Sequence, residues 1–572
     1  MRHDRLLIPR SLKRRSRPPE PARNPPDVAS ALAAMGAEEL RSFVRDALGK
    51  LDDEPRMQFE DALLRRAATA GSGWRPDAPS QAAVEQAERF AEAARRVGQA
   101  DPHDVDEHLR QGVKASLAGD HAGARAILGA LLPPIADAEI DLGQHELADE
   151  VLSVDLHDCA ARYLAAVYGM TPLDGRAAAV LDGLEAVQGL AYLSAPIDAM
   201  ERAVAGPLPD LDRFLSLWIG RLEKEDGPAG DWESDRDRWL REAVARAEGT
   251  AGLERLARST KRPEAARAWC SSVVAQGDWS LALRAYEDRA KLVSSPLWRG
   301  DFLDGAALAA HVLGRKDLTK RLAAAWNGSP SLLRLLRYLV ADEPAPAALG
   351  RRAAAALKEG PKKSPRLEGL LHLVSGDIAS AAELLAKAPG LGWSREDHPG
   401  GLLFPAFAWL LGRAPRGSVR GEIAAVLQHP LTSDLDLALP FDMGVVTGRV
   451  AMKADLPAPS VVDVLRRSSV ADELTPKDRA VVLTALKRAA TARVRGVLQK
   501  KRRRHYDHAA MLVACCVELE ARSGKAAPPS AWVEVLRGRT SRYPAFQAAL
   551  RRALAQATTF KAAEGSLAPE TG

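Results

Sequence analysis

The clearest indication of the fold is the ten-residue segment Gly277-Asp278-Trp279-Ser280-Leu281-Ala282-Leu283-Arg284-Ala285-Tyr286. The glycine can end one helix in a left-handed conformation, and the aspartate can cap the start of the next. Trp279, Ala282 and Tyr286 then stand at helical spacing and give the second helix one apolar stripe. The stretch therefore predicts a corner between two consecutive helices.

The same corner recurs twice elsewhere, at Gly119-Asp120 and Gly376-Asp377. Each copy has alanine at the same offset and a large apolar residue four positions later. The copies begin 158 and 99 residues apart, so no fixed period joins them. We predict an all-α fold, built as an irregular array of antiparallel helical hairpins. The residues assigned to its corners are Gly119, Asp120, Ala124, Gly277, Asp278, Ala282, Tyr286, Gly376, Asp377 and Ala381.

The composition agrees with a helical protein. Apolar residues make up 46% of the 572 residues but aromatic ones only 5%, and strand-like runs rich in Val, Ile and Thr are sparse. Four cysteines are too few for a disulfide framework, and no stretch approaches the roughly 20 apolar residues of a membrane span. We expect a cytoplasmic protein without a membrane association.

Proline, glycine and charge patterns divide the chain into segments. We expect a disordered basic tail, an N-terminal helical segment with a linker, a helical-hairpin array, a helical continuation after a Gly/Pro-rich connector, a C-terminal helical region with a basic segment, and a disordered tail. Their expected ranges are 1–26, 27–78, 79–390, 391–458, 459–560 and 561–572.

The corner phrases resemble those of tetratricopeptide-type repeats, and the stretch from Trp269 to Ala290 is the best match. In that family a Gly or Asp corner precedes a second helix that carries a small residue and then an aromatic one. The family's period is about 34 residues, which this chain does not keep. The resemblance implies an α-solenoid whose surface binds another protein.

Two wider resemblances concern longer parts of the chain. Residues 80–410 resemble an uncharacterised bacterial family of helical, tetratricopeptide-like repeat proteins, through the stretches Ile140–Leu147, Trp239–Glu242, Gly300–Gly305 and Gly390–Trp393. Residues 490–557 resemble the helical tail of some bacterial SWIM zinc-finger proteins. The zinc motif of those proteins, Cys-x-Cys followed by Cys-x-His, is absent, so the resemblance implies no zinc site.

The densest group of metal-ligand residue types lies between Asp137 and Cys159. His145 and Asp149 are four residues apart and can share a helix face, and His157 could supply a third ligand. This spacing is generic, and no His-Glu-x-x-His pattern accompanies it. A solvated, capped acidic helix is the favoured interpretation, and we expect no cofactor.

Basic residues gather in two places. Residues 1–26 hold eight Lys or Arg and two acids, and residues 487–504 hold nine Lys or Arg and no acid. Such clusters can neutralise phosphates, although cations near a helix C-terminus also complement the helix dipole. The candidates for binding a polyanion are Arg493, Arg495, Lys500, Lys501, Arg502, Arg503 and Arg504.

No phosphate-binding loop, dinucleotide-binding glycine motif or nucleophile elbow occurs in the chain. The favoured hypothesis is a non-enzymatic helical scaffold or adaptor that binds another protein in a cytoplasmic complex, near the second and third corners. One alternative is a nucleic-acid-associated protein that uses residues 487–504 and the N-terminal tail. The other is a metal-dependent enzyme that uses residues 137–159. The partner and the oligomeric state stay open.

Overall fold

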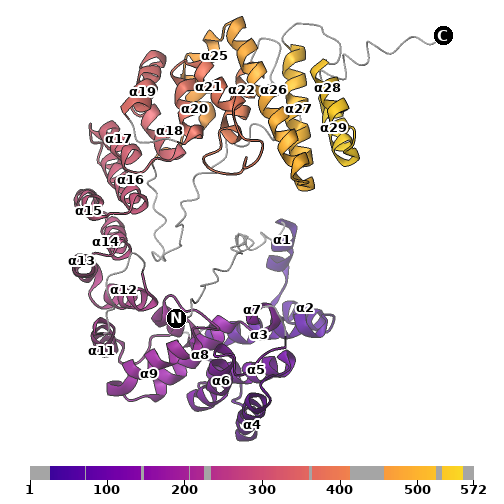
Figure 1. The fold of residues 1–572 in the computed structure, drawn as a ribbon. Helices are drawn as coiled ribbons and strands as arrows, with labels where there is room; N and C mark the ends of the chain where they lie inside the picture. The colour runs from indigo at the N-terminus through magenta and orange to yellow at the C-terminus, as the bar shows by residue number, and fades with distance from the viewer. Residues whose placement is uncertain are drawn as a thin grey trace, which may run out of the picture. The chain divides into compact units, whose positions relative to one another are not determined.

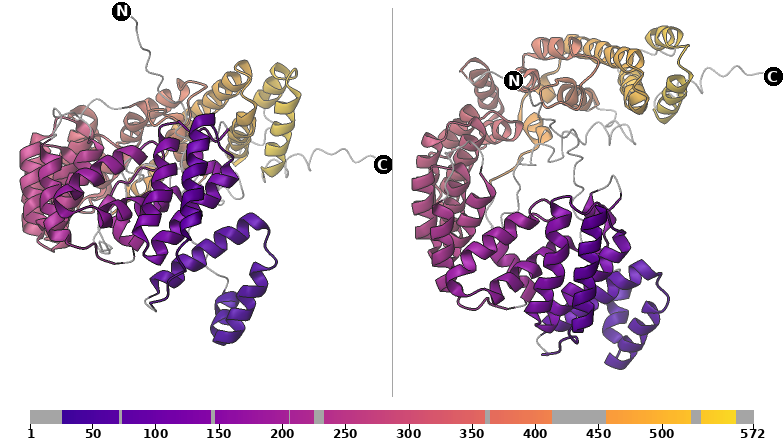
Figure 2. Two further views of the ribbon diagram at one scale, coloured as in Figure 1. Left: turned by 90° about the horizontal axis from the view of Figure 1, so that it is seen from below. Right: turned by 60° about the horizontal axis from the view of Figure 1, so that its bottom comes forward.

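The structure is a computed structural model that describes residues 26–70, 73–143, 147–204, 206–224, 233–359, 364–412, 456–522 and 531–557 (Figure 1). Within these ranges the regular elements are helices and no β-strand forms, as two further views also show (Figure 2). The predicted all-α class is therefore confirmed. The tails expected at 1–26, apart from Pro26, and at 561–572 lie outside the described residues.

The chain divides into two compact units, Met1–Glu248 and Gly249–Gly572. The division falls inside the range 79–390, which the sequence assigned to one array. The first unit contains α1 (Pro26–Ala34), α2 (Ala37–Leu48), α3 (Asp53–Thr69), α4 (Gln81–Val97), α5 (Pro102–Ala118), α6 (His121–Ala136), α7 (Ala148–Val151), α8 (Leu156–Met170), α9 (Leu173–Val187), α10 (Pro196–Val204), α11 (Leu211–Glu223) and α12 (Asp235–Ala247).

In the first unit, α6 and α8 form the centre of the core. Helix α6 packs on α4, α5, α8 and α9, and α8 also packs on α10. The side chains between them are fully buried, among them Leu109, Ile127, Leu128 and Leu164. Helices α2 and α3, in contrast, bury no residue. The stability of this unit therefore comes from α4 to α12, since apolar burial is the main favourable contribution to folding.

Glu242 is a largely buried carboxylate that joins two segments of the first unit. Its oxygens accept the backbone N–H groups of Asp198 at 2.8 Å and Ile197 at 3.3 Å, in the first turn of α10. Burial is the largest influence on this group and raises its pKa to about 7, although those two hydrogen bonds and Arg246 act in the opposite direction.

The raised pKa of Glu242 makes stability depend on pH. The folded state holds the proton of Glu242 more tightly than the unfolded chain does. The stabilisation of the fold by this proton is therefore present at pH 4–5 and is lost as pH rises toward 7–8. Between pH 5 and pH 8, we expect the free energy of unfolding of the wild-type protein to fall by about 2–3 kcal/mol more than that of the Glu242→Gln variant. Urea unfolding of both proteins at the two pH values measures the difference. If the unfolding free energies of both proteins changed equally with pH, Glu242 would not be the group responsible.

The second unit contains α13 (Gly249–Thr260), α14 (Pro263–Ala275), α15 (Trp279–Leu292), α16 (Pro296–Val312), α17 (Leu318–Gly328), α18 (Leu332–Val340), α19 (Pro346–Glu359), α20 (Pro365–Val374), α21 (Ile378–Ala386), α22 (Gly400–Gly412), α24 (Val461–Arg467), α25 (Val470–Glu473), α26 (Pro476–Gln499), the short 3₁₀ helix η1 (Arg503–His505), α27 (Tyr506–Arg522), α28 (Ala531–Arg539) and α29 (Pro544–Gln556).

The packing of the second unit changes character at α21. From α13 to α21 each helix packs on the next one along the chain. Beyond that point helices also pack on neighbours that are distant in sequence: α26 packs on α21, and α22 packs on α26 and α27 as well as on α20 and α21. Nearly every residue of α22, Gly-Gly-Leu-Leu-Phe-Pro-Ala-Phe-Ala-Trp-Leu-Leu-Gly, is buried. A helix that is apolar on all sides requires such an enclosure.

No helix in the described part of the chain is long and apolar enough to cross a membrane. The four cysteines are all buried free thiols.

Candidate functional site

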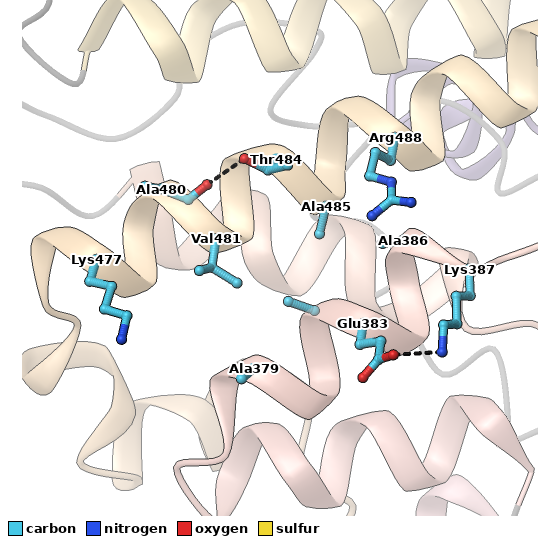
Figure 3. Close-up of a pocket in the computed structure, with 11 residues that line it drawn as sticks. Ala379, Glu383, Ala386, Lys387, Lys477, Ala480, Val481, Thr484, Ala485 and Arg488 are labelled. Atoms are coloured by element: carbon cyan, nitrogen blue, oxygen red, sulfur yellow. Dashed lines mark hydrogen bonds and ion pairs between the residues drawn. The ribbon is translucent and has the colours of Figure 1, made fainter.

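A groove lies between α21 and α26 in the second unit (Figure 3). It has a volume of about 510 Å³ and opens to solvent. Small side chains face it from both helices, because alanine occupies positions 379, 382 and 386 of α21 and positions 480 and 485 of α26. The methyl groups of these alanines are too small to fill the space between the two packed helices, and a groove therefore remains between them.

Local capping fixes the two walls of the groove. Asp377 caps α21, and its carboxylate accepts the backbone N–H of Ser380 at 3.1 Å. Thr475 caps α26 through a reciprocal capping box with Asp478, and Pro476 occupies the first turn. The third Gly-Asp corner therefore stands at the start of one wall of the groove.

The rim of the groove carries three cations and one acid. Glu383 pairs with Lys387 at 2.5 Å, and both side chains are exposed. Lys477 and Arg488 make no ion pair with any described residue (Figure 3). Val481, whose side chain is 37% exposed, adds an apolar contact between them. The groove thus combines an apolar floor with an excess of positive charge.

A second hollow of about 370 Å³ lies where Leu456–Pro459 crosses α17 and α18. Leu456 is buried there against Leu322 and Ala341. Its lining carries both signs of charge, from Arg337, Asp342, Glu343, Asp463 and Arg467, with Arg467 and Glu343 3.7 Å apart. A mixed and partly paired lining gives this hollow no preference for a ligand of either charge.

The structure separates the seven polyanion-binding candidates into two groups. Arg495 and the run Lys500–Arg504 are exposed, and none of them makes an ion pair with a described residue. Arg493 is only 5% exposed and lies on the inner side of α26. Its guanidinium donates to the carbonyl oxygen of Gly390 at 3.2 Å and stacks 5.9 Å from the ring centroid of Trp393. Arg493 therefore holds a loop in place.

The loop beneath Arg493 packs unusually closely on α26. A Cβ at Gly390 would stand 2.1 Å from the carbonyl oxygen of Ala492, and one at Gly496 would stand 2.9 Å from the carbonyl carbon of Gly390. Both positions therefore require glycine. This contact positions Trp393 against His398 and His508, at ring-centroid distances of 5.4 Å.

His508 is a neutral base in this cluster. Burial, followed by the charge of Arg493, lowers its pKa to about 4. His398 is buried, receives the backbone N–H of Gly400 on Nδ1 at 3.0 Å and contacts the carbonyl oxygen of Pro389 through Nε2 at 2.9 Å. The second nitrogen therefore carries the proton. These rings pack the interior of the second unit.

The basic run follows a tight turn at the end of α26. Arg502 donates its backbone N–H to Val497 at 2.9 Å and Lys501 donates to Leu498 at 3.1 Å, while Lys501 has a φ of +50°. The same hydrogen-bond pattern ends α5 at Gly119 and α20 at Gly376, which have φ values of +84° and +89°. Lysine thus occupies the position that glycine takes at these two corners.

The residues of the three Gly-Asp corners have local structural partners. Asp120 and Asp278 accept the backbone N–H groups of Gly123 and Leu281, at 2.9 and 2.8 Å. The alanines that follow the corners, at 124, 282 and 381, are fully buried. Tyr286 is partly buried and its ring lies against Gly305, where an added Cβ would stand 2.4 Å away. These residues shape the fold through helix caps and core contacts.

The proposed metal ligands do not form a site in the described part of the chain. His145 lies outside the described residues, while Asp149 on α7 and His157 on α8 are exposed. No group of three or more His, Cys, Asp or Glu side chains within the described ranges is arranged to hold a metal ion.

The Gly-Asp phrase does not mark every corner of this kind, and it gives no indication of the groove. Gly314 has a φ of +62° and ends α16 with the same pair of hydrogen bonds, from Gly314 to His311 and from Arg315 to Ala310. Its aspartate, Asp317, stands three residues later, so the Gly-Asp phrase does not appear there. The alanine spacing of α21 and α26 was visible in the sequence, but their pairing was not.

A scan against protein-family models and a search of curated proteins find no match to this chain.

Proposed function

We propose that this protein is a non-enzymatic, tetratricopeptide-like helical scaffold that acts in the cytoplasm and binds a partner protein in the groove between α21 and α26. The observation that carries the proposal is the composition of the groove. An alanine floor leaves room for one face of a helix, and Lys477 and Arg488 stand on its rim without an ion pair to any residue that the structure describes. A partner segment that fits is an amphipathic helix with an apolar face and acidic flanks.

The arrangement of the neighbouring helices supports this interpretation. Helices α13 to α21 pack one on the next, as hairpins of a repeat array would. Each Gly-Asp corner uses its polar groups for caps and its apolar groups for the core. Binding is therefore the function that remains for the exposed surface of these helices.

A photo-crosslinking amino acid at Ala480 tests the groove. We expect crosslinks to one acidic partner in cells, and none when the crosslinker replaces Ala347, an exposed alanine on α19. Lys477→Glu combined with Arg488→Glu should reduce the crosslinked product about 10-fold or more, because both charges at the rim reverse. Lys316→Glu combined with Lys320→Glu changes the net charge equally at a distant exposed site and should leave the yield unchanged.

Nuclease treatment before purification separates the two classes of partner. A crosslinked protein that persists after nuclease supports the scaffold. Equal crosslinking from Ala480 and Ala347, or a product that disappears with nuclease, would count against a protein in this groove.

A further inference from the structure

The C-terminal helices of the second unit are strongly basic. Residues 479–557 contain 17 Lys or Arg and four Asp or Glu, a net charge of +13, whereas the whole chain has a net charge of +5. The rest of the chain is therefore acidic, with a net charge of −8. A charge asymmetry of this size indicates a polyanionic partner for the basic part.

None of the four acids of this region forms an ion pair with Arg495 or with the run Lys500–Arg504 in the described part of the chain. Glu520 pairs with Lys487 at 2.5 Å, Glu534 with Arg537 at 3.0 Å and Asp507 with Arg552 at 2.7 Å. Glu518 is buried. The exposed side chains of Arg495 and Lys500–Arg504 make no ion pair with a described residue.

The fold holds these cations on a fixed corner. The turn at Lys501 is closed by two backbone hydrogen bonds, and Tyr506, three residues after Arg503, is buried with its ring against Phe546 at a centroid distance of 5.8 Å. The corner leads from a 24-residue helix directly into α27. The helix dipole at the end of α26 favours one or two cations there, but it does not account for five in succession.

The side chains of this region distinguish among polyanions. Its only exposed large apolar residues in the described ranges are Val481 and Val535, so it lacks the apolar face that binds a lipid surface. Its aromatic residues Tyr506 and Phe546 are buried, and Trp532 and Tyr543 pack on the core. Within the described residues of this region, no exposed Phe, Tyr or Trp ring is available to stack on the bases of a single strand. Thirteen of the 17 cations are arginines, whose planar guanidinium suits phosphate oxygens.

We propose that the surface formed by Arg495 and Lys500–Arg504 binds the phosphate backbone of a duplex nucleic acid, without reading its base sequence. This interaction is separate from the groove between α21 and α26 and does not require a partner protein.

Fluorescence anisotropy with the full-length protein and a labelled duplex of mixed sequence, about 20 base pairs long, tests the proposal. Five or six phosphate contacts predict a slope near −5 when log K is plotted against log salt concentration. Arg502→Glu, Arg503→Glu and Arg504→Glu together should weaken binding at least about 30-fold at 100 mM salt and flatten the slope by about 3.

The matched control is Lys316→Glu, Lys320→Glu and Lys358→Glu, which makes the same change in net charge at exposed lysines of the same unit. It should bind duplex within about threefold of wild type, because exposed charges beyond a Debye length are largely screened. Unchanged thermal unfolding of both triple variants shows that they are folded.

Several results would overturn the proposal: no duplex binding at 50 mM salt, equal losses in both triple variants, or tighter binding to a single strand or to anionic vesicles than to duplex. Since purified protein is used, these results leave crosslinking at Ala480 unaffected. The failure of one proposal can thus be distinguished from the failure of the other.

Discussion

Arg334→Met is expected to lower the free energy of unfolding of the second unit by about 3–5 kcal/mol. The Arg334 side chain is buried at the start of α18, and its guanidinium joins α16 to α18. Nε donates to Asp304 at 2.7 Å, one terminal nitrogen donates to Asp301 at 3.1 Å, and the other donates to Ser329 Oγ at 2.7 Å. Methionine occupies similar space but removes this guanidinium from two largely buried carboxylates, and only the weaker contact of Arg337 with Asp304, at 3.9 Å, remains.

The effect of Arg334→Met should depend on pH in a defined direction. Burial raises the pKa of Asp301 and Asp304 even with the arginine present. Without Arg334 their pKa values rise further, and the folded variant binds protons more tightly than its unfolded chain. Its stability is therefore recovered as pH falls and lost as pH rises through the raised pKa values. The loss should be smaller at pH 5 than at pH 8.

Urea unfolding monitored by circular dichroism at both pH values measures this effect. Arg258→Met provides the control, since Arg258 pairs with Glu254 on the exposed surface of α13 and should contribute no more than about 1 kcal/mol. A loss below 1 kcal/mol for Arg334→Met, or a loss independent of pH, would show that the carboxylates do not depend on this guanidinium.

Phe407→Ala is expected to destabilise the second unit by about 3–5 kcal/mol, because it removes a fully buried ring from α22 and leaves a cavity. Four helices surround α22, so the cavity cannot collapse without moving several of them. The same unfolding experiment measures the loss. Phe43→Ala is the matched control: this ring on α2 is 56% exposed, and its removal should change stability by less than about 1 kcal/mol. Equal effects at the two positions would contradict the enclosure of α22.

The sequence predicted those parts of the fold that depend on neighbouring residues. The roles of Gly277 and Asp278 were predictable from the sequence because both act within one helical turn. Gly277 adopts the left-handed conformation, and Asp278 accepts the backbone N–H of the residue three positions later. The corner at Lys501 was not predictable, because lysine adopts the left-handed conformation there without any glycine to mark it.

The candidate site was predictable in composition but not in arrangement. The sequence shows a basic segment without acids, but it does not show that Arg493 is buried and Arg495 exposed on α26. Helical geometry separates positions two residues apart by about 200°, which puts one inside and one outside.

The groove depends on contact between α21 and α26, whose starts are 98 residues apart. Such long-range pairing is set by packing and leaves no local pattern.

The enclosure of α22 also has a consequence for synthesis of the protein. The ribosome completes residues 400–412 well before α26 and α27, which end at positions 499 and 522, so two of the four covering helices do not yet exist. Of the four helices that pack on α22 in the described part of the chain, only α20 and α21 exist during that interval. Exposed apolar segments of nascent chains are prone to aggregation and bind chaperones. Termination of translation between residues 412 and 476 should therefore yield a product that aggregates or is degraded, whereas the full-length chain buries this helix.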